Sequence, residues 1–127
     1  MSKTGTNTGK SNIRIPPQHI SSEQAVLGSI MLRKDAMHEI EDVLVPESFY
    51  VEKHRIIFNA MLELASKNEP IDMLSLSTKL AEKKLLDQVG GNKYLAEIVN
   101  TVPSSTNVRH YADIVQKKYV LRSLIEA

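Results

Sequence analysis

The sequence predicts an all-α fold, a small single-domain bundle of about six helices, and two observations support that prediction. Apolar residues recur three and four positions apart through most of the chain, which is the period of an amphipathic helix. No stretch keeps the alternation of apolar and polar residues that marks a half-buried strand. With 127 residues, 42% of them hydrophobic, the chain fits one domain with one core.

The chain opens on a polar segment, and the helical domain is expected to begin after it. Residues 1–14 are mostly Gly, Ser, Thr, Asn and Lys, so we expect a disordered tail there and the helical domain at 15–127. Pro16 and Pro17 favour an extended approach to the first helix. Ser21 and Gln24 form the pattern of a capping box, and Ile20 is placed as a hydrophobic staple. The expected buried face of this helix consists of Val26, Leu27, Ile30 and Met31.

The next stretch predicts a short helix, a turn and a long helix. Asp35 is a suitable N-cap for the short helix, whose apolar residues are Met37, Ile40, Val43 and Leu44. Residues 46–50 predict a single turn that places Phe49 and Tyr50 in the core. The long helix should cover roughly 52–66, with the stretch from Asn68 to Pro70 terminating it. It should be central in the fold, because it carries Ile57, Phe58, Met61, Leu62 and Ala65.

Two further helices follow before the last one. Asp72 is placed to cap a fourth helix, whose apolar face consists of Met73, Leu76 and Leu80. Gly90 and Gly91 predict a turn. A fifth helix should then end before Pro103, with an apolar face made of Tyr94, Leu95, Ile98 and Val99.

The last helix should start at Ser105 or Thr106 and run to the end of the sequence. Its first half has an apolar stripe that a small bundle can bury, formed by Val108, Tyr111, Ala112 and Val115. Its second half stays apolar without any Gly or Asn cap, through Val120, Leu121, Leu124 and Ile125. We expect these four side chains to be covered by a partner, or the helix to continue in a longer protein.

The residues offer no pattern of catalytic, cofactor-binding or metal-binding chemistry. There are no cysteines, and the four histidines lack metal-site spacing, so we interpret them as surface or locally satisfied polar groups. Gly5–Ser11 resembles a phosphate-binding loop, but only three residues separate its glycines and Pro16-Pro17 blocks the helix that would have to follow. A small nucleotide-binding enzyme built on this segment is therefore disfavoured. No apolar run is long enough to span a membrane, so we expect a cytoplasmic protein.

The charge distribution argues against nucleic-acid binding. The net charge is +1, but three basic residues, Lys3, Lys10 and Arg14, precede the first acidic one. Without them 13 basic residues face 15 acidic ones, and no basic cluster is visible. A stand-alone helical DNA-binding module remains the alternative function, and salt-dependent DNA retention by a form without the tail would support it.

Five blocks of the sequence, in order, resemble the N-terminal domain of the bacterial replicative DNA helicases of the DnaB family. They are IPPQHISSEQAVLGSIML at 15–32, PESFYVEKHRIIFNAM at 46–61, EPIDMLSLSTKL at 69–80, VGGNKYLAEI at 89–98 and VPSSTNVRHYADIVQKKYVLRSLI at 102–125. The resemblance covers nearly all of the chain from residue 15 onward. The Walker motifs of the family's ATPase motor are absent from this sequence.

The resemblance implies a protein-interaction domain without catalysis of its own. In the family this helical domain is a collar on a hexameric ring, its copies pair through a helical hairpin, and ATP and Mg²⁺ belong to the separate motor. The implied partners are further copies of the protein, the C-terminal domain of primase, and a helicase loader or initiator protein. The implied interface residues are Tyr94, Val120, Leu121, Leu124 and Ile125, of which Tyr94 and Ile125 correspond to primase contacts; Tyr94 fits a core position equally well. We expect this chain alone to be a monomer or a weak dimer, its last helix cut short of the hairpin.

Overall fold

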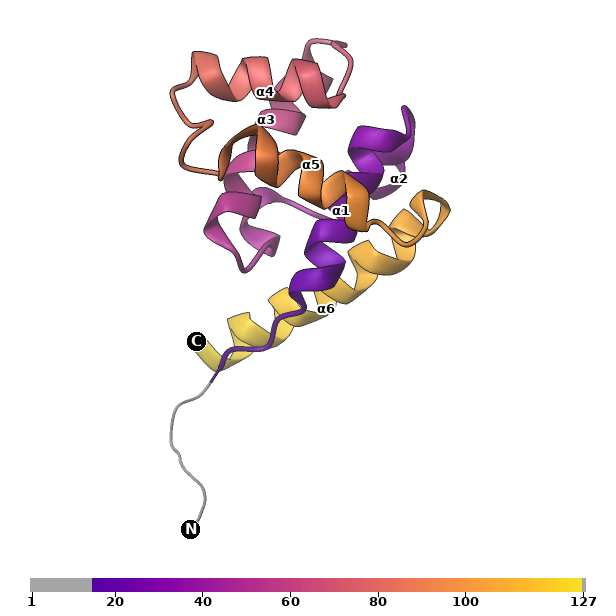
Figure 1. Cartoon of the computed structure of the whole chain (residues 1–127). Helices are drawn as coiled ribbons and strands as arrows, with labels where there is room; N and C mark the ends of the chain where they lie inside the picture. Colours follow the sequence, from indigo (N-terminus) through magenta and orange to yellow (C-terminus); the bar gives the residue numbers. More distant parts are fainter. Residues whose placement is uncertain (1–14, 127) are drawn as a thin grey trace.

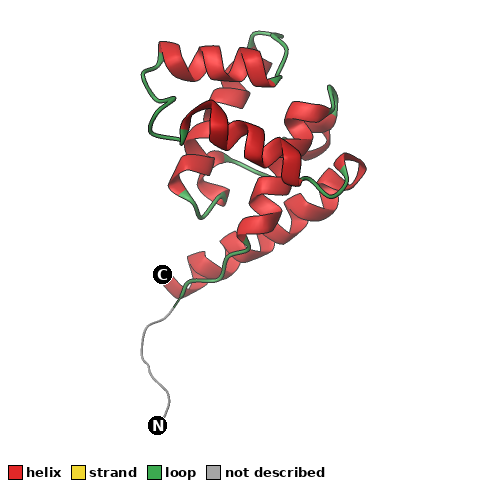
Figure 2. Ribbon diagram, viewed as in Figure 1, coloured by secondary structure: helices red, strands yellow, loops and turns green. Residues whose placement is uncertain are grey.

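A computed structural model describes residues 15–126 of the chain, and within that range the fold is all-helical, as predicted (Figure 2). In chain order the elements are α1 (Ile20–Leu32), α2 (Ala36–Ile40), the 3₁₀ turn η1 (Pro46–Ser48), α3 (Glu52–Ser66), α4 (Met73–Glu82), α5 (Gly91–Thr101), the 3₁₀ turn η2 (Ser105–Asn107) and α6 (Val108–Glu126). The predicted tail at 1–14, with its glycine-rich segment 5–11, lies outside the described residues.

Helix α1 is the central element, because α5 and α6 both pack extensively against it (Figure 1). Helix α3 packs against α1 and α4, and α4 also packs against α5, while α6 runs diagonally beneath the rest of the molecule in this view. The segment before α1 lies beside the C-terminal half of α6. Gly28 lets α1 and α5 approach closely, since a Cβ at this position would lie 2.1 Å from Cγ2 of Val102 and 3.0 Å from the carbonyl oxygen of Ile98.

One continuous core joins these helices, and most of the predicted apolar faces supply it. All four residues predicted for the buried face of α1 are buried, as are Leu76 and Leu80 of α4. Phe49 and Phe58 are fully buried, with ring centroids 5.0 Å apart. In α6 the stripe of Val108, Ala112 and Val115 is buried against α1 and α2, while Tyr111 is half-buried.

Several local predictions were accurate. Helix α3 covers 52–66 as expected, and the carboxylate of Asp72 accepts a hydrogen bond from the Ser75 N–H at 2.8 Å, capping α4. Gly90 precedes α5 with φ 102°, a left-handed conformation that glycine adopts without strain. The turn expected at Gly90 and Gly91 is therefore present.

Other local predictions were wrong. Helix α1 is capped by His19 instead of Ser21, because Nδ1 of His19 accepts from the Ser22 N–H at 3.2 Å; Ile20 is then the first residue of the helix. Asp35 occupies the N-cap position of α2 without capping it, and its carboxylate pairs with Arg33 at 2.8 Å. Helix α2 ends at Ile40, before Val43 and Leu44.

Two further expectations need correction. Tyr50 is half-buried, because only Phe49 of the η1 turn enters the core fully. Residues 105–107 form the separate turn η2, so the last α-helix begins at Val108.

Candidate protein interface

The outer half of α6 exposes apolar side chains on the side opposite to its buried stripe. The exposed fractions are 45% for Val120, 37% for Leu121, 71% for Leu124 and 68% for Ile125. At 100° per residue, these four positions lie on one side of the helix, and Val108, Ala112 and Val115 lie on the other. These are four of the five residues predicted from the sequence to form an interface.

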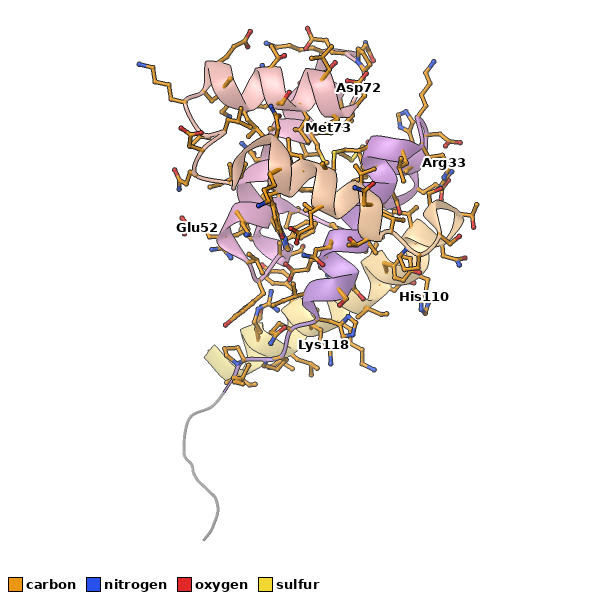
Figure 3. The ribbon with its side chains drawn as sticks, viewed as in Figure 1. Arg33, Glu52, Asp72, Met73, His110 and Lys118 are labelled. Carbon is orange, nitrogen blue, oxygen red and sulfur yellow. The ribbon has the colours of Figure 1, made fainter. Side chains whose placement is uncertain are left out.

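The surroundings of this outer half give the surface its borders. On the N-terminal half of the same helix, exposed residues are polar, including His110 and Asp113 (Figure 3). The segment before α1, which is joined to α6 by the hydrogen bond from Arg122 to the carbonyl oxygen of Pro17, adds Ile15, which is 73% exposed. We call the exposed side chains of Val120, Leu121, Leu124 and Ile125 the α6 apolar face.

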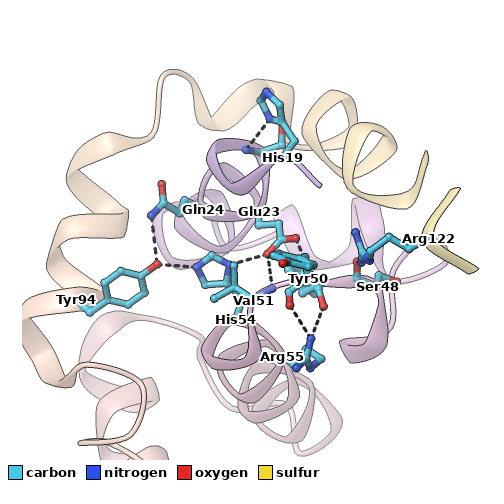
Figure 4. A network of polar contacts seen from close by, with 12 residues as sticks. His19, Glu23, Gln24, Ser48, Tyr50, Val51, His54, Arg55, Tyr94 and Arg122 are labelled. Carbon is cyan, nitrogen blue, oxygen red and sulfur yellow. Dashed lines mark hydrogen bonds and ion pairs between the residues drawn. The ribbon is translucent and has the colours of Figure 1, made fainter. Parts of the chain in front are cut away.

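Tyr94 lies elsewhere, in a polar network that connects α1, α3 and α5 (Figure 4). Its hydroxyl contacts Nε2 of His54 at 2.6 Å and accepts from Nε2 of Gln24 at 3.2 Å. Its ring is half-buried, and the Lys53 ammonium lies 3.7 Å from the ring centroid. The pKa of the Tyr94 hydroxyl is raised above its ordinary value, mainly by burial. The hydrogen bond from Gln24 acts in the opposite direction but is the smaller effect. No hydrogen bond joins Tyr94 to α6 in the described part of the chain.

The other end of this network is a buried carboxylate on α1. Glu23 is 1% exposed and accepts hydrogen bonds from the N–H groups of Tyr50 at 2.7 Å and Val51 at 3.3 Å. Its third partner is Nδ1 of His54, which is fully buried, at 2.8 Å. Because a carboxylate only accepts, Nδ1 carries the proton, and Nε2 can then accept from the Tyr94 hydroxyl. The network fixes the start of α3 and the start of α5 against α1.

The sequence analysis did not predict the contact between Glu23 and His54, although the spacing of both residues from apolar neighbours indicates that they are buried. Glu23 precedes Val26, Leu27 and Ile30 by three, four and seven residues, which places it on the buried face of α1. His54 stands in the same relation to Ile57, Phe58 and Met61. We expected a local partner for His54, and the partner lies 31 residues away.

Arg122 is a second buried charge that the sequence analysis did not single out. It is 6% exposed and donates to the carbonyl oxygen of Pro17 at 2.7 Å and to that of Ser48 at 2.9 Å. It therefore ties α6 to the segment before α1 and to η1. Its burial could have been predicted, because Arg122 lies seven residues after Val115 and therefore on the buried stripe of α6.

The described residues contain no arrangement of metal ligands and no membrane-crossing helix. Between residues 15 and 126, no three His, Asp or Glu side chains come close enough to hold a metal ion. None of the helices in that range combines the length and the hydrophobicity needed to cross a bilayer.

Comparison with known proteins identifies the family. Residues 15–117 match the family described as the DnaB-like helicase N terminal domain. The chain belongs to this family. It is 46% identical over 114 residues to the replicative DNA helicase DnaC of Bacillus subtilis and 46% identical over 112 residues to DnaB of Geobacillus stearothermophilus. These matches cover 90% and 88% of the chain but only 25% of each helicase, so the chain spans about a quarter of their length.

Solved structures show the same domain. The N-terminal domain of DnaB helicase from Mycobacterium tuberculosis aligns with a TM-score of 0.86 and 38% identity, covering 88% of this chain and 81% of that one. A DnaB-like replicative helicase, described together with its interactions with primase, aligns at 0.76 and 32%, covering 85% of this chain and 25% of that one. The N-terminal domain from Helicobacter pylori, also described with primase, aligns at 0.71 and 25%. Both the family resemblance and the all-α fold predicted from the sequence are therefore confirmed.

Proposed function

We propose that this chain is the protein-interaction domain of a hexameric replicative DNA helicase, acting at the replication fork in the bacterial cytoplasm. In this proposal its copies pair to support the ring, and the assembled collar receives primase and a loader or initiator protein. The motor that hydrolyses ATP with Mg²⁺ belongs to another part of the helicase. The supporting observation is the α6 apolar face, which this fold leaves uncovered.

The energetics favour helix-on-helix packing at this face. Full burial of an exposed leucine or isoleucine supplies ~1.5–3 kcal/mol before the entropy of association is subtracted. Leu124 and Ile125, both about 70% exposed, have most of that contribution still available. Two such residues supply ~3–6 kcal/mol, which reaches only the lower end of an association cost of ~4–15 kcal/mol. We therefore expect this chain to be a monomer or a weak dimer, and the whole helicase to assemble more tightly.

The primase proposal rests on the family relation together with the predicted interface residues. Two related helicases are described with primase interactions. Ile125 offers an apolar anchor on α6, while Tyr94 offers a half-buried ring on α5. Tyr94 is the weaker candidate, because its hydroxyl is already held by His54 and Gln24.

The test uses the full-length helicase and compares a charged substitution on the α6 apolar face with one elsewhere. The double variant L124D/I125D should shift the oligomer distribution toward smaller species in sedimentation velocity. It should also weaken binding of the primase C-terminal domain in calorimetric titration. The matched control is Leu74→Asp, because Leu74 on α4 is 76% exposed and lies outside the α6 apolar face. Unchanged assembly and unchanged primase affinity in the double variant would refute the proposal.

A further inference from the structure

A hollow of about 250 Å³ lies between η1, the start of α3 and α6. Its lining includes Glu47, Tyr50, Arg55, Tyr119, Arg122 and Ser123. Positions 119, 122 and 123 lie on a different side of α6 from the α6 apolar face, as their helical spacing requires. The hollow is therefore a separate surface.

The two arginines in this hollow lack the carboxylate partners that the other described arginines have. Arg33 pairs with Asp35 and Glu39, and Arg109 pairs with Asp42 and Asp113. Neither Arg55 nor Arg122 has a carboxylate within 4.0 Å among the side chains described at 15–125, although Arg122 is only 6% exposed. Buried charges in proteins are usually paired, so this concentration of uncompensated positive charge favours an anionic ligand.

The hydrogen bonds to the backbone hold both guanidinium groups in fixed positions. Arg55 donates from Nη1 to the carbonyl oxygens of Phe49 at 2.9 Å and Tyr50 at 2.8 Å (Figure 4). Its Nε and Nη2 form no hydrogen bond with other described residues. The Arg122 guanidinium is anchored to two further carbonyls and lies 5.4 Å from the ring centroid of Tyr50 and 5.9 Å from that of Tyr119. Groups held in this way lose little entropy when a ligand binds.

The chemistry of the lining selects among anions. A guanidinium fork matches the planar geometry of a carboxylate, and the hydroxyls of Tyr50 and Tyr119, unbonded among the described residues, can donate as well. Glu47 also lines the hollow, so its net charge is only about one positive unit, which disfavours a phosphate dianion or a nucleic-acid strand. Tyr and Arg are also the residue types that dominate protein–protein hot spots.

We propose that this hollow is a docking site for an aspartate or glutamate side chain from an acidic segment of a protein partner. The carboxylate accepts from the free N–H groups of Arg55 and from the tyrosine hydroxyls, while Arg122 supplies positive charge from behind. The proposal does not depend on pairing or primase binding through the α6 apolar face, and either can fail without the other.

The test is an NMR titration of the ¹⁵N-labelled chain with a short, end-blocked glutamate peptide, which is compared with a glutamine peptide, inorganic phosphate and a thymidine oligonucleotide. The glutamate peptide should shift the Arg55 Nε–H resonance and the backbone amides of Tyr50 and Ser123. R55Q should weaken binding at least about tenfold, as expected for loss of a hydrogen bond to a charged group. R109Q, which removes an arginine on α6 outside the hollow, should leave the affinity unchanged.

A second variant keeps the test valid if R55Q unfolds. Glu47 is exposed and forms no hydrogen bond with another described residue, so E47Q should fold normally and bind the glutamate peptide about twofold more tightly. Absence of any shift at millimolar glutamate peptide would overturn the proposal. Equal affinity in the native chain and in E47Q would also overturn it, as would equal response to phosphate or to the oligonucleotide.

Discussion

The buried carboxylate of Glu23 provides the sharpest stability prediction, because its loss would leave several buried groups without partners. Replacing it by alanine removes the acceptor for the N–H groups of Tyr50 and Val51 and for Nδ1 of His54. A buried donor left unsatisfied costs about 1–3 kcal/mol, and two donors, the Tyr50 N–H and the Nδ1–H of His54, lose bonds of 2.7 and 2.8 Å. The Val51 bond is long at 3.3 Å and adds little. We therefore expect Glu23→Ala to lower the free energy of unfolding by about 2–6 kcal/mol.

That loss is a large part of the total, since a domain of this size is stable by about 5–15 kcal/mol. Urea denaturation followed by circular dichroism measures it directly. Glu23→Gln retains one acceptor oxygen but turns an amide N–H₂ toward the other donors, so its effect should be intermediate. Glu82→Ala is the matched control, because Glu82 is exposed on α4 and should change stability by no more than about 0.5 kcal/mol. If Glu23→Ala and Glu82→Ala had equal stabilities, the network would contribute nothing and the reasoning would fail.

Three other perturbations have defined outcomes. Gly28→Ala should destabilise the domain by about 1–3 kcal/mol in urea titration, because its methyl group would collide with Val102 and push α1 from α5; a neutral result would show that α5 yields at no cost. Asp72→Ala removes the α4 cap and should cost about 1 kcal/mol, with Asp72→Asn close to native. The hydrogen bond from Lys83 lowers the pKa of the Glu63 carboxyl, so Glu63 stabilises the fold above roughly pH 5 and this contribution disappears as pH falls through the lowered value. The Tm difference between the native chain and Glu63→Gln should accordingly vanish in acid, and a difference independent of pH would contradict the assignment.

Most of the fold could be predicted from the sequence because most of its helices are indicated by local patterns of apolar and capping residues. Apolar spacing predicted the approximate range of α3, and Asp72 marked the start of α4. The predicted start of α1 was wrong because an unusual group serves as its cap: the imidazole of His19 takes the place of a serine hydroxyl. The prediction that Asp35 caps α2 was wrong for a different reason, because Arg33 competes for the Asp35 carboxylate. Such competition depends on side-chain positions that a linear pattern does not specify.

The candidate interface could be predicted only in part, for a similar reason. The exposure of the four apolar residues on α6 follows from their being on the side opposite to its buried stripe, and helical spacing shows this directly. Tyr94 could not be assigned, because its partners Gln24 and His54 lie 70 and 40 residues away in the chain. The hollow at Arg55 and Arg122 could not be predicted from the sequence either, because its lining comes from η1, α3 and α6, which are far apart in the chain.

Helix α6 has a mechanical consequence. Its 19 residues form a rod of about 28 Å without a break, with one half embedded in the core and the other half carrying the apolar face. No hinge separates the two halves, and Arg122 clamps the protruding half to the segment before α1 and to η1. A protein that binds the C-terminal half of α6 would therefore fix the orientation of the entire domain. A rotation of that half would be transmitted to α1, because α6 packs directly against α1.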